Sequence, residues 1–203
     1  MTRRIVDILI SLAALAAGAL PGLLIAIAIR RESPGGAIFR QRRVGLNGKC
    51  FDMLKFRTMR SDADPYGDSP NSGQDSRLTR VGRFLRETSL DELPQLVNVL
   101  AGQMTLIGPR PLYERQAALW TARQRRRLEV KPGLTGFAQV YGRGSLTHER
   151  KIDLDVYYVD NQGFGMDLRI IFRTIADLFL TGRSEIYERQ CRRAQEPQAH
   201  RKA

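Results

Sequence analysis

Residues 3–31 read RRIVDILISLAALAAGALPGLLIAIAIRR, and this stretch decides the architecture of the chain. Between residues 5 and 29 the only polar side chains are those of Asp7 and Ser11. A helix of this length, at about 1.5 Å per residue, could cross a hydrocarbon core of roughly 30 Å. A secretory signal peptide is disfavoured, because arginines follow the apolar run where small residues should mark a cleavage site. The stretch therefore predicts a membrane segment over residues 1–31.

A proline and two pairs of arginines bear on how this segment sits in the membrane. Pro21 lacks the amide that would bond to the carbonyl of Ala17 and crowds that turn, so a kink is expected at Leu20-Pro21. Arginine pairs flank the segment at residues 3–4 and 30–31, and such clusters favour the cytoplasmic side. We therefore predict a re-entrant helix, broken at Pro21, that enters and leaves by one leaflet. A straight transmembrane span is the alternative.

The composition describes a basic protein with enough apolar residues for one folded core. The chain has 203 residues, 42% of them hydrophobic, and 33 Lys and Arg against 21 Asp and Glu, which gives a formal net charge of +12. On charge alone nucleic acid is the first candidate partner, ahead of anionic lipid and phosphorylated substrates. Cys50 and Cys191 lack metal-ligand spacing, and His148 and His200 are the only histidines. We therefore expect reduced thiols and no chemistry carried by histidine.

Periodicity and turn residues predict the elements of the remaining chain. Residues 37–57 are expected to form a hairpin around the Asn47-Gly48 turn signal. A surface loop is expected over 61–76, and disorder after about Gln190. Apolar spacing predicts a short strand over 104–107 and helices over 77–87, 94–101, 112–130, 146–160 and 167–180.

These elements predict an α+β, mainly helical fold. It comprises the re-entrant membrane helix, a small β-hairpin and a compact cytoplasmic domain with interfacial amphipathic helices. The apolar stripe of the helix over 167–180 is either core, the commoner case, or membrane interface. We divide the chain into the membrane helix at 1–31, one domain at 32–190 and a basic, disordered tail at 191–203.

Two adjacent carboxylates are the first candidates for chemistry. Ser89 and Glu92 match a capping box ahead of an apolar run, which is a purely structural interpretation. Pro94 argues against it, because proline prefers the first helical position and would crowd a turn that began at Ser89. If the helix begins at Pro94, Asp91 and Glu92 lie at its approach. There an aspartate can attack phosphorus, and its neighbour can hold Mg²⁺.

Three further segments carry cations or glycines. Arg110 lies between two prolines. This segment is either a rigid connector or a means of holding the Arg110 guanidinium in position to bind a phosphate. Lys55 and Arg57 lie two residues apart at the end of the predicted hairpin and therefore share a face. They are either a pair of cations directed at a ligand or, by default, the solvated end of a strand. Residues 131–143 hold repeated glycines, which suit tight turns or close approach to a ligand but do not form a Walker loop.

Together these motifs resemble the bacterial sugar transferase family, the small monotopic phosphoglycosyl transferases. The order and spacing of the motifs carry the resemblance, from the apolar segment to about residue 180. The matching segments are Lys55-Phe-Arg-Thr-Met59, Leu78-Thr-Arg-Val-Gly82, Arg86-Glu-Thr-Ser-Leu-Asp-Glu-Leu-Pro-Gln-Leu96, Asn98-Val-Leu100, Gly108-Pro-Arg-Pro-Leu112, Lys131-Pro-Gly-Leu-Thr-Gly136 and Asp153-Leu-Asp-Val-Tyr-Tyr158.

The resemblance implies an enzyme at the cytoplasmic face of the bacterial inner membrane, with residues 32–190 as its catalytic domain. It implies transfer of a phosphosugar from a UDP-sugar to undecaprenyl phosphate, the first membrane step of glycoconjugate assembly. Asp91 would attack the β-phosphate, UMP would leave, and undecaprenyl phosphate would then take the phosphosugar from the aspartate. Asp91 and Glu92 are the implied Mg²⁺ ligands. The implied substrate- and phosphate-binding residues are Lys55, Arg57, Arg86, Arg110 and Arg143, and Asp155 is implied as either a structural or a substrate-site carboxylate.

The chain departs from the family pattern at three positions. Leu20 precedes Pro21 where serine is common, Phe137 replaces a tryptophan, and Tyr141 stands where asparagine is common. The sugar, the pathway and homo-oligomerisation are left open.

Two rival functions are kept beside this one. A membrane-tethered nucleic-acid-binding or scaffold protein explains the charge and the anchor, but not the carboxylate pair or the scarcity of aromatic residues for base stacking. A transferase that moves the sugar without its phosphate would release UDP rather than UMP.

Overall fold

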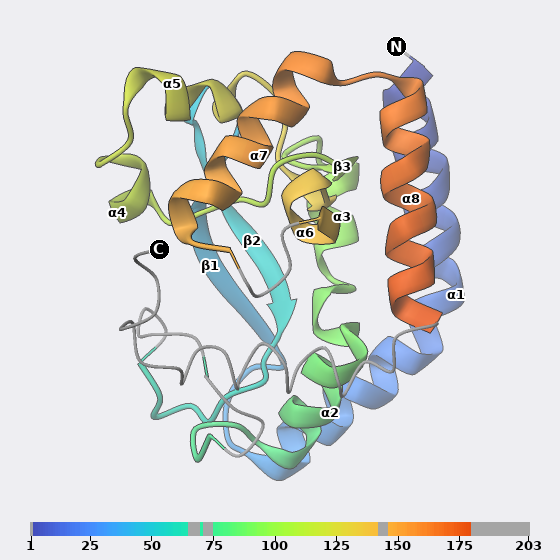
Figure 1. Cartoon of the computed structure of the whole chain (residues 1–203). Helices are drawn as coiled ribbons and strands as arrows, with labels where there is room; N and C mark the ends of the chain where they lie inside the picture. Colours follow the sequence, from blue (N-terminus) through green and yellow to red (C-terminus); the bar gives the residue numbers. More distant parts are fainter. Residues whose placement is uncertain (1, 65–69, 71–74, 142–145, 180–203) are drawn as a thin grey trace.

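The computed structural model describes residues 2–64, 70, 75–141 and 146–179. Within this part of the chain the molecule is mainly helical with two small two-stranded sheets, as expected for the α+β class (Figure 1). A long N-terminal helix, α1 (Thr2–Glu32), lies along one side of the other elements. The tail predicted at 191–203 lies outside the described residues.

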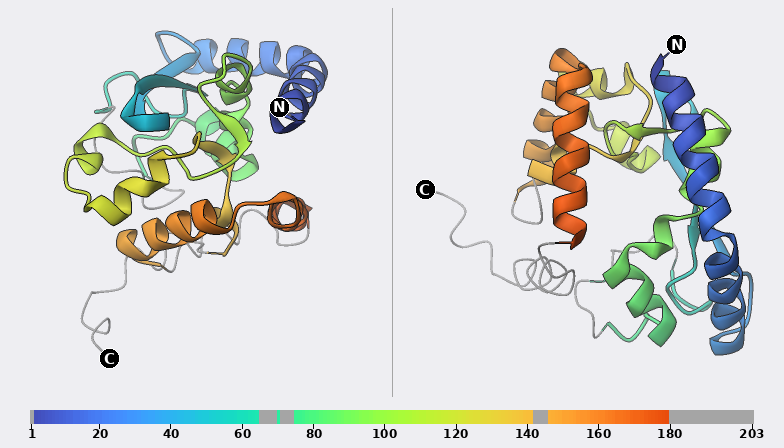
Figure 2. Two further views of the ribbon diagram at one scale, coloured as in Figure 1. Left: turned by 90° about the horizontal axis from the view of Figure 1, so that it is seen from above. Right: turned by 90° about the vertical axis from the view of Figure 1, so that its right-hand side faces the viewer.

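Helix α1 has the length and the exposure of a membrane segment. It runs without interruption through Pro21, while its axis changes direction between its two halves (Figure 2). It is long and apolar enough to cross a membrane. Many of its large apolar side chains are exposed, including Ile5, Leu9, Leu20, Leu23 and Leu24. The re-entrant path itself stays a prediction.

The N-terminal turns of α1 dock on the rest of the molecule through polar contacts. Arg4 donates to the last two carbonyls of α3 (Gln95–Leu100), where a helix has unpaired acceptors. Asp7 is buried and accepts hydrogen bonds from the Thr105 hydroxyl at 2.7 Å and the Leu106 amide at 3.1 Å. A polar residue inside an apolar helix thus has a structural reason, because it fixes α1 to the domain.

The second half of α1 packs through small and aliphatic residues. Gly18 lets the helix approach closely, since a Cβ there would lie 3.1 Å from the side chain of Leu93. Ile29 is buried in a cluster with Phe56 and Leu85. Helix α1 is therefore part of the protein core as well as a candidate membrane segment.

The predicted hairpin is present. Strands β1 (Ile38–Val44) and β2 (Cys50–Phe56) pair antiparallel, with the first residue of one opposite the last of the other. The turn η1 (Leu46–Gly48) contains Asn47 at φ 53° and Gly48 at φ 78°. Asparagine and glycine tolerate this left-handed backbone, so the Asn-Gly signal located the turn correctly.

The predicted helices over 77–87 and 94–101 and the strand over 104–107 are also found, with slightly shifted boundaries. They bring together the chain segments around the carboxylates. The elements are α2 (Arg80–Thr88), the 3-10 turn η2 (Leu90–Glu92), α3, and β3 (Thr105–Ile107), which pairs parallel with β4 (Gly133–Thr135).

The single long helix predicted over 112–130 is wrong. The segment forms three short pieces, α4 (Glu114–Ala117), α5 (Ala122–Arg125) and the 3-10 turn η3 (Arg126–Leu128). Thr121 starts the second piece, because its side chain caps the amide of Gln124. Trp120 lies between the first two pieces and is buried against Ile152 and Val156. The prediction of one basic helix failed because it did not take into account that this aromatic side chain faces the core.

The last two predicted helices correspond to α7 (His148–Asn161) and α8 (Phe164–Phe179), while α6 (Phe137–Tyr141) was not predicted. On α8, the stripe residues Leu168 and Phe172 are 40% and 64% exposed. These side chains are therefore not part of the core, and the membrane-interface alternative stays a prediction.

Candidate active site

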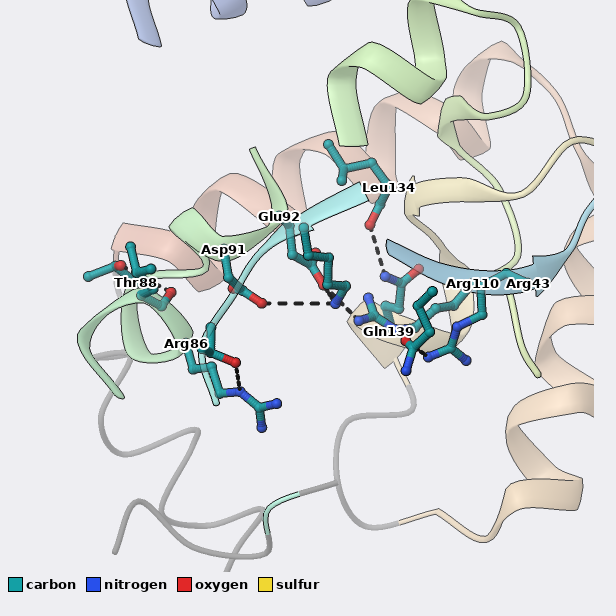
Figure 3. A network of polar contacts seen from close by, with 12 residues as sticks. Arg43, Arg86, Thr88, Asp91, Glu92, Arg110, Leu134 and Gln139 are labelled. Carbon is teal, nitrogen blue, oxygen red and sulfur yellow. Dashed lines mark hydrogen bonds and ion pairs between the residues drawn. The ribbon is translucent and has the colours of Figure 1, made fainter. Parts of the chain in front are cut away.

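The two carboxylates lie in η2, between α2 and α3 (Figure 3). Ser89 ends α2 with a left-handed backbone at φ 56°, and its side chain caps neither turn. The capping-box interpretation is therefore wrong. Helix α3 begins at Gln95, with Pro94 at its N-cap, one position before the first helical position that was predicted for it. Asp91 and Glu92 consequently occupy the approach to α3.

Two cations reach Glu92 from other elements. Lys55, near the end of β2, places Nζ 3.0 Å from Oε1 of Glu92 and 3.9 Å from Oδ2 of Asp91. Arg110, which follows β3, places Nη2 2.7 Å from the same oxygen of Glu92. The structure thus brings four of the predicted site residues into one cluster (Figure 3).

Burial and charge divide the two carboxylates. The side chains of Asp91 and Glu92 are 11% and 21% exposed. Burial raises the pKa of Asp91, and the nearby charge of Glu92 adds to the rise while Lys55 opposes it. Burial acts on Glu92 too, but Arg110 and Lys55 outweigh it and hold the pKa of Glu92 well below its usual range. Glu92 is therefore a fixed anion, and Asp91 keeps the more basic, less compensated carboxylate.

Asn98 sets the position of Lys55. Its buried side chain accepts from the Leu54 amide at 2.9 Å and donates to the Asp52 carbonyl at 2.8 Å. It thus bonds to the edge of β2 as a neighbouring strand would. Because Asn98 belongs to α3, this clamp fixes the hairpin relative to the carboxylate turn, with Lys55 one residue beyond the clamp.

The main chain at Arg110 is fixed by close packing of the neighbouring glycines and by a buried ion pair. Close packing explains the glycines of the motifs, since a Cβ at Gly133 would lie 2.0 Å from the nitrogen of Gly108. Arg127 donates from Nη2 to the carbonyl of Arg110 at 2.6 Å and pairs with Asp155 at 2.6 Å. Arg127 and Asp155 are only 3% and 4% exposed. The main chain at Arg110 therefore rests on a rigid internal support.

Two of the predicted cations bind other parts of the chain. Arg57 donates to the carbonyls of Ser33 and Pro34, which joins the end of the hairpin to the end of α1. Arg86 donates from Nε to the Thr58 hydroxyl at 3.0 Å. Its charge nevertheless opposes the rise that burial causes in the pKa of Asp91, and it lies on the Asp91 side of the pair (Figure 3).

The remaining two predicted residues are not part of the described cluster. Asp155 pairs with Arg127 and lies behind Arg110 instead of beside the carboxylates. Arg143 lies outside the described residues.

Sequence reasoning missed two cations near Arg110. Arg43 stacks on the ring of Tyr113 at 3.6 Å, and burial together with the charge of Arg110 lowers the pKa of Arg43 to about 10. Lys151 on α7 is half-buried, and burial and Arg110 lower the pKa of Lys151 as well. Neither residue stands in a motif of special composition. Only the spacing of Lys151 four residues before Asp155, on one helical face, could have indicated it.

The carboxylate pair fits a magnesium ion that arrives with a phosphorylated substrate. Among the described residues no group of three or more His, Cys, Asp or Glu could hold a metal. Mg²⁺, however, usually takes only one or two carboxylates besides substrate phosphates and water. Asp91 has Lys55 at 3.9 Å as its ion-pair partner within the described chain. Its oxygens are therefore suited to a cation.

Together, the exposed apolar helix and the cation-bound carboxylate pair define a membrane-associated protein with a site suited to phosphate groups. The family model described as bacterial sugar transferase matches residues 1–181. A sugar transferase of Bacillus subtilis named EpsL is 46% identical over 160 residues, which cover 78% of each chain.

Two further relatives carry a more specific name, "UDP-glucose:undecaprenyl-phosphate glucose-1-phosphate transferase". The protein of Caulobacter vibrioides is 45% identical over 167 residues, covering 78% of this chain and 62% of that protein. The protein of Escherichia coli is 40% identical over 159 residues, covering 74% of this chain and 34% of that protein. The chain belongs to the bacterial sugar transferase family, which confirms the resemblance and the prediction of a transferase.

Proposed function

We propose that the protein transfers a phosphosugar from a UDP-sugar to undecaprenyl phosphate through a covalent intermediate on Asp91. The observation that carries the proposal is the division of the carboxylate pair. Glu92 is bound by Lys55 and Arg110, whereas Asp91 remains the less compensated nucleophile. The names of the Caulobacter and Escherichia coli relatives support this substrate pair and make UDP-glucose the first donor to test.

In the first step, an oxygen of Asp91 forms a bond to the β-phosphorus of the UDP-sugar. The bond from that phosphorus to the bridging oxygen breaks, and UMP leaves with the electron pair. Phosphoryl transfer depends mainly on positioning and on neutralising charge. Lys55 and Arg110 stand beside the pair and can neutralise the donor phosphates.

In the second step, a phosphate oxygen of undecaprenyl phosphate attacks the phosphorus of the phosphosugar-aspartate. The acyl phosphate bond breaks, Asp91 is regenerated as a carboxylate, and undecaprenyl-diphospho-sugar is released. The scheme is ping-pong, because UMP departs before the lipid reacts.

Magnesium belongs to the proposal as the cofactor, with Asp91 and Glu92 as its protein ligands. When bound, it would neutralise charge on the diphosphate. The protein supplies the two carboxylates and the surrounding cations that orient the substrate.

A UMP-release assay tests the proposed function. We expect the full chain in detergent, with Mg²⁺, UDP-glucose and undecaprenyl phosphate, to release UMP. The same protein with the donor alone should gain the mass of a phosphosugar. EDTA should suppress both signals. Release of UDP in place of UMP would favour the rival that transfers the sugar alone, and salt-dependent duplex binding without turnover would favour the nucleic-acid rival.

We also propose that α1 is re-entrant and that the active site faces the cytoplasm at the bacterial inner membrane. Both ends of α1 contact the same domain, through Asp7 near one end and Ile29 near the other. A straight span would carry one end of the helix across the bilayer, away from that domain. The bent axis of α1 and its flanking arginines support the same path (Figure 2).

Cysteine labelling in intact cells tests this topology. Cysteines placed at Thr2 and at Glu32, one at a time in a Cys50→Ser, Cys191→Ser background, are both expected to be shielded from a membrane-impermeant maleimide. Both should react after the inner membrane is permeabilised. Labelling of the Thr2 position from outside would establish the straight span.

A further inference from the structure

The charges around the carboxylate pair do not balance within the described chain. The two carboxylates, Asp91 and Glu92, are already matched in number by Lys55 and Arg110, and the charge of Arg86 acts on Asp91 as well. Two further cations lie on the Arg110 side of the site. Arg43 stacks on the ring of Tyr113, and Lys151 is half-buried on α7. Neither forms an ion pair with a carboxylate of the described residues. Partly buried positive charge without a counter-charge is costly, so this side of the site is built for an anion.

Lys151 is placed there by the internal support of Arg110. It lies one helical turn before Asp155 on α7, so the two side chains share a face. Asp155 binds Arg127, and Arg127 donates to the carbonyl of Arg110. The adjacent residue, Arg150, differs from Lys151 in both respects, because its side chain is 65% exposed and forms an ion pair with Asp153 at 4.0 Å.

The two sides of the carboxylate pair differ in their surroundings. Arg86 lies on the Asp91 side, whereas Arg110 and Arg43 lie beyond Glu92 (Figure 3). The Asp91 side adjoins α2, which exposes Phe84 and packs on the second half of α1. Helix α7 lies away from that half of α1 in both Figure 1 and Figure 2. A lipid phosphate is therefore suited to the apolar α1–α2 side, and a water-soluble nucleotide to the α7 side.

We propose that Lys151 binds the phosphate of the donor nucleotide, the group that leaves with UMP, and that the donor occupies the α7 side of the carboxylate pair. The proposal rests on the proposed function and names its donor subsite. An ammonium group in this position forms a charge-assisted hydrogen bond to a phosphate oxygen. Binding of the nucleotide also supplies the counter-charge that the described chain lacks on this side.

Calorimetric binding of UDP to the full chain in detergent tests the proposal without turnover. We expect Lys151→Met to raise the Kd for UDP by about 10- to 100-fold, because a hydrogen bond to a charged group is lost. Lys151→Arg should restore most of the affinity, since it keeps the charge. The matched control Arg150→Met removes the neighbouring, exposed charge and should change the Kd by less than about threefold.

A second measurement separates donor from acceptor binding. Wild type and Lys151→Met are each loaded with phosphosugar, and the discharge of the adduct by undecaprenyl phosphate is followed. We expect the lipid concentration that gives half-maximal discharge to be the same for Lys151→Met as for the wild type. The proposal would be overturned if Lys151→Met bound UDP as tightly as the wild type does, or if its only defect were in discharge of the adduct. A wild type that binds UDP but forms no adduct would refute the proposed function while leaving the donor subsite standing.

Discussion

Replacing Asp91 with asparagine is expected to abolish UMP release and adduct formation, with a loss on the order of 10⁴-fold or more. The amide is nearly the same size as the carboxylate but cannot form an acyl phosphate. UMP release reports the rate, and the intact mass of the protein incubated with donor reports the adduct. UDP should still bind, because Lys55 and Arg110 remain in place.

Asp153→Asn is the matched control for this change. Asp153 lies on α7 with a side chain 40% exposed and pairs only loosely with Arg150 at 4.0 Å. Its substitution should leave UMP release near the wild-type rate. A phosphosugar adduct on the Asp91→Asn protein would overturn the covalent mechanism and point to another nucleophile.

Replacing Arg127 with methionine is expected to destabilise the fold by about 3–5 kcal/mol, because it leaves the carboxylate of Asp155 buried without its partner. UMP release should also fall, since the carbonyl of Arg110 loses its donor. Trp120 is the only tryptophan in the chain, and its buried ring lies 4.8 Å from the guanidinium of Arg127. Its fluorescence during denaturant unfolding therefore reports on this support directly.

The double variant Arg127→Met, Asp155→Leu separates lost charge from lost packing. Replacing both members of a buried ion pair with apolar residues is often close to neutral for stability. We expect the double variant to recover much of the unfolding free energy but little of the activity, because the hydrogen bond to Arg110 is still missing. A double variant as active as wild type would show that Arg110 does not depend on this support.

The sequence predicted the parts of the site that depend on local backbone rules. The Asn47-Gly48 turn located the hairpin and so the end of β2 that carries Lys55. Pro94 placed the start of α3, and with it the turn that holds Asp91 and Glu92. Each of these signals acts through the conformation of its own residue or its immediate neighbours.

Long-range pairing was beyond the sequence. Asp155 and Arg127 are 28 positions apart, and composition cannot show that each neutralises the other inside the core. Arg57 reads as one more free cation, yet its guanidinium binds carbonyls at the end of α1. Such roles depend on which segments the fold brings together. In the sequence, a charged residue that faces a substrate looks the same as one that binds a backbone oxygen.

The packing of α1 changes how the enzyme can be simplified. Gly18 and Gly22 lie against Leu93, the residue that follows Glu92. A helix exchanged for a generic hydrophobic anchor of equal length would carry bulkier residues at these two positions and push on the turn that holds Asp91 and Glu92. Truncation to a soluble fragment would instead remove the surface on which that turn rests. Localisation and chemistry thus share the same residues, and neither can be engineered without the other.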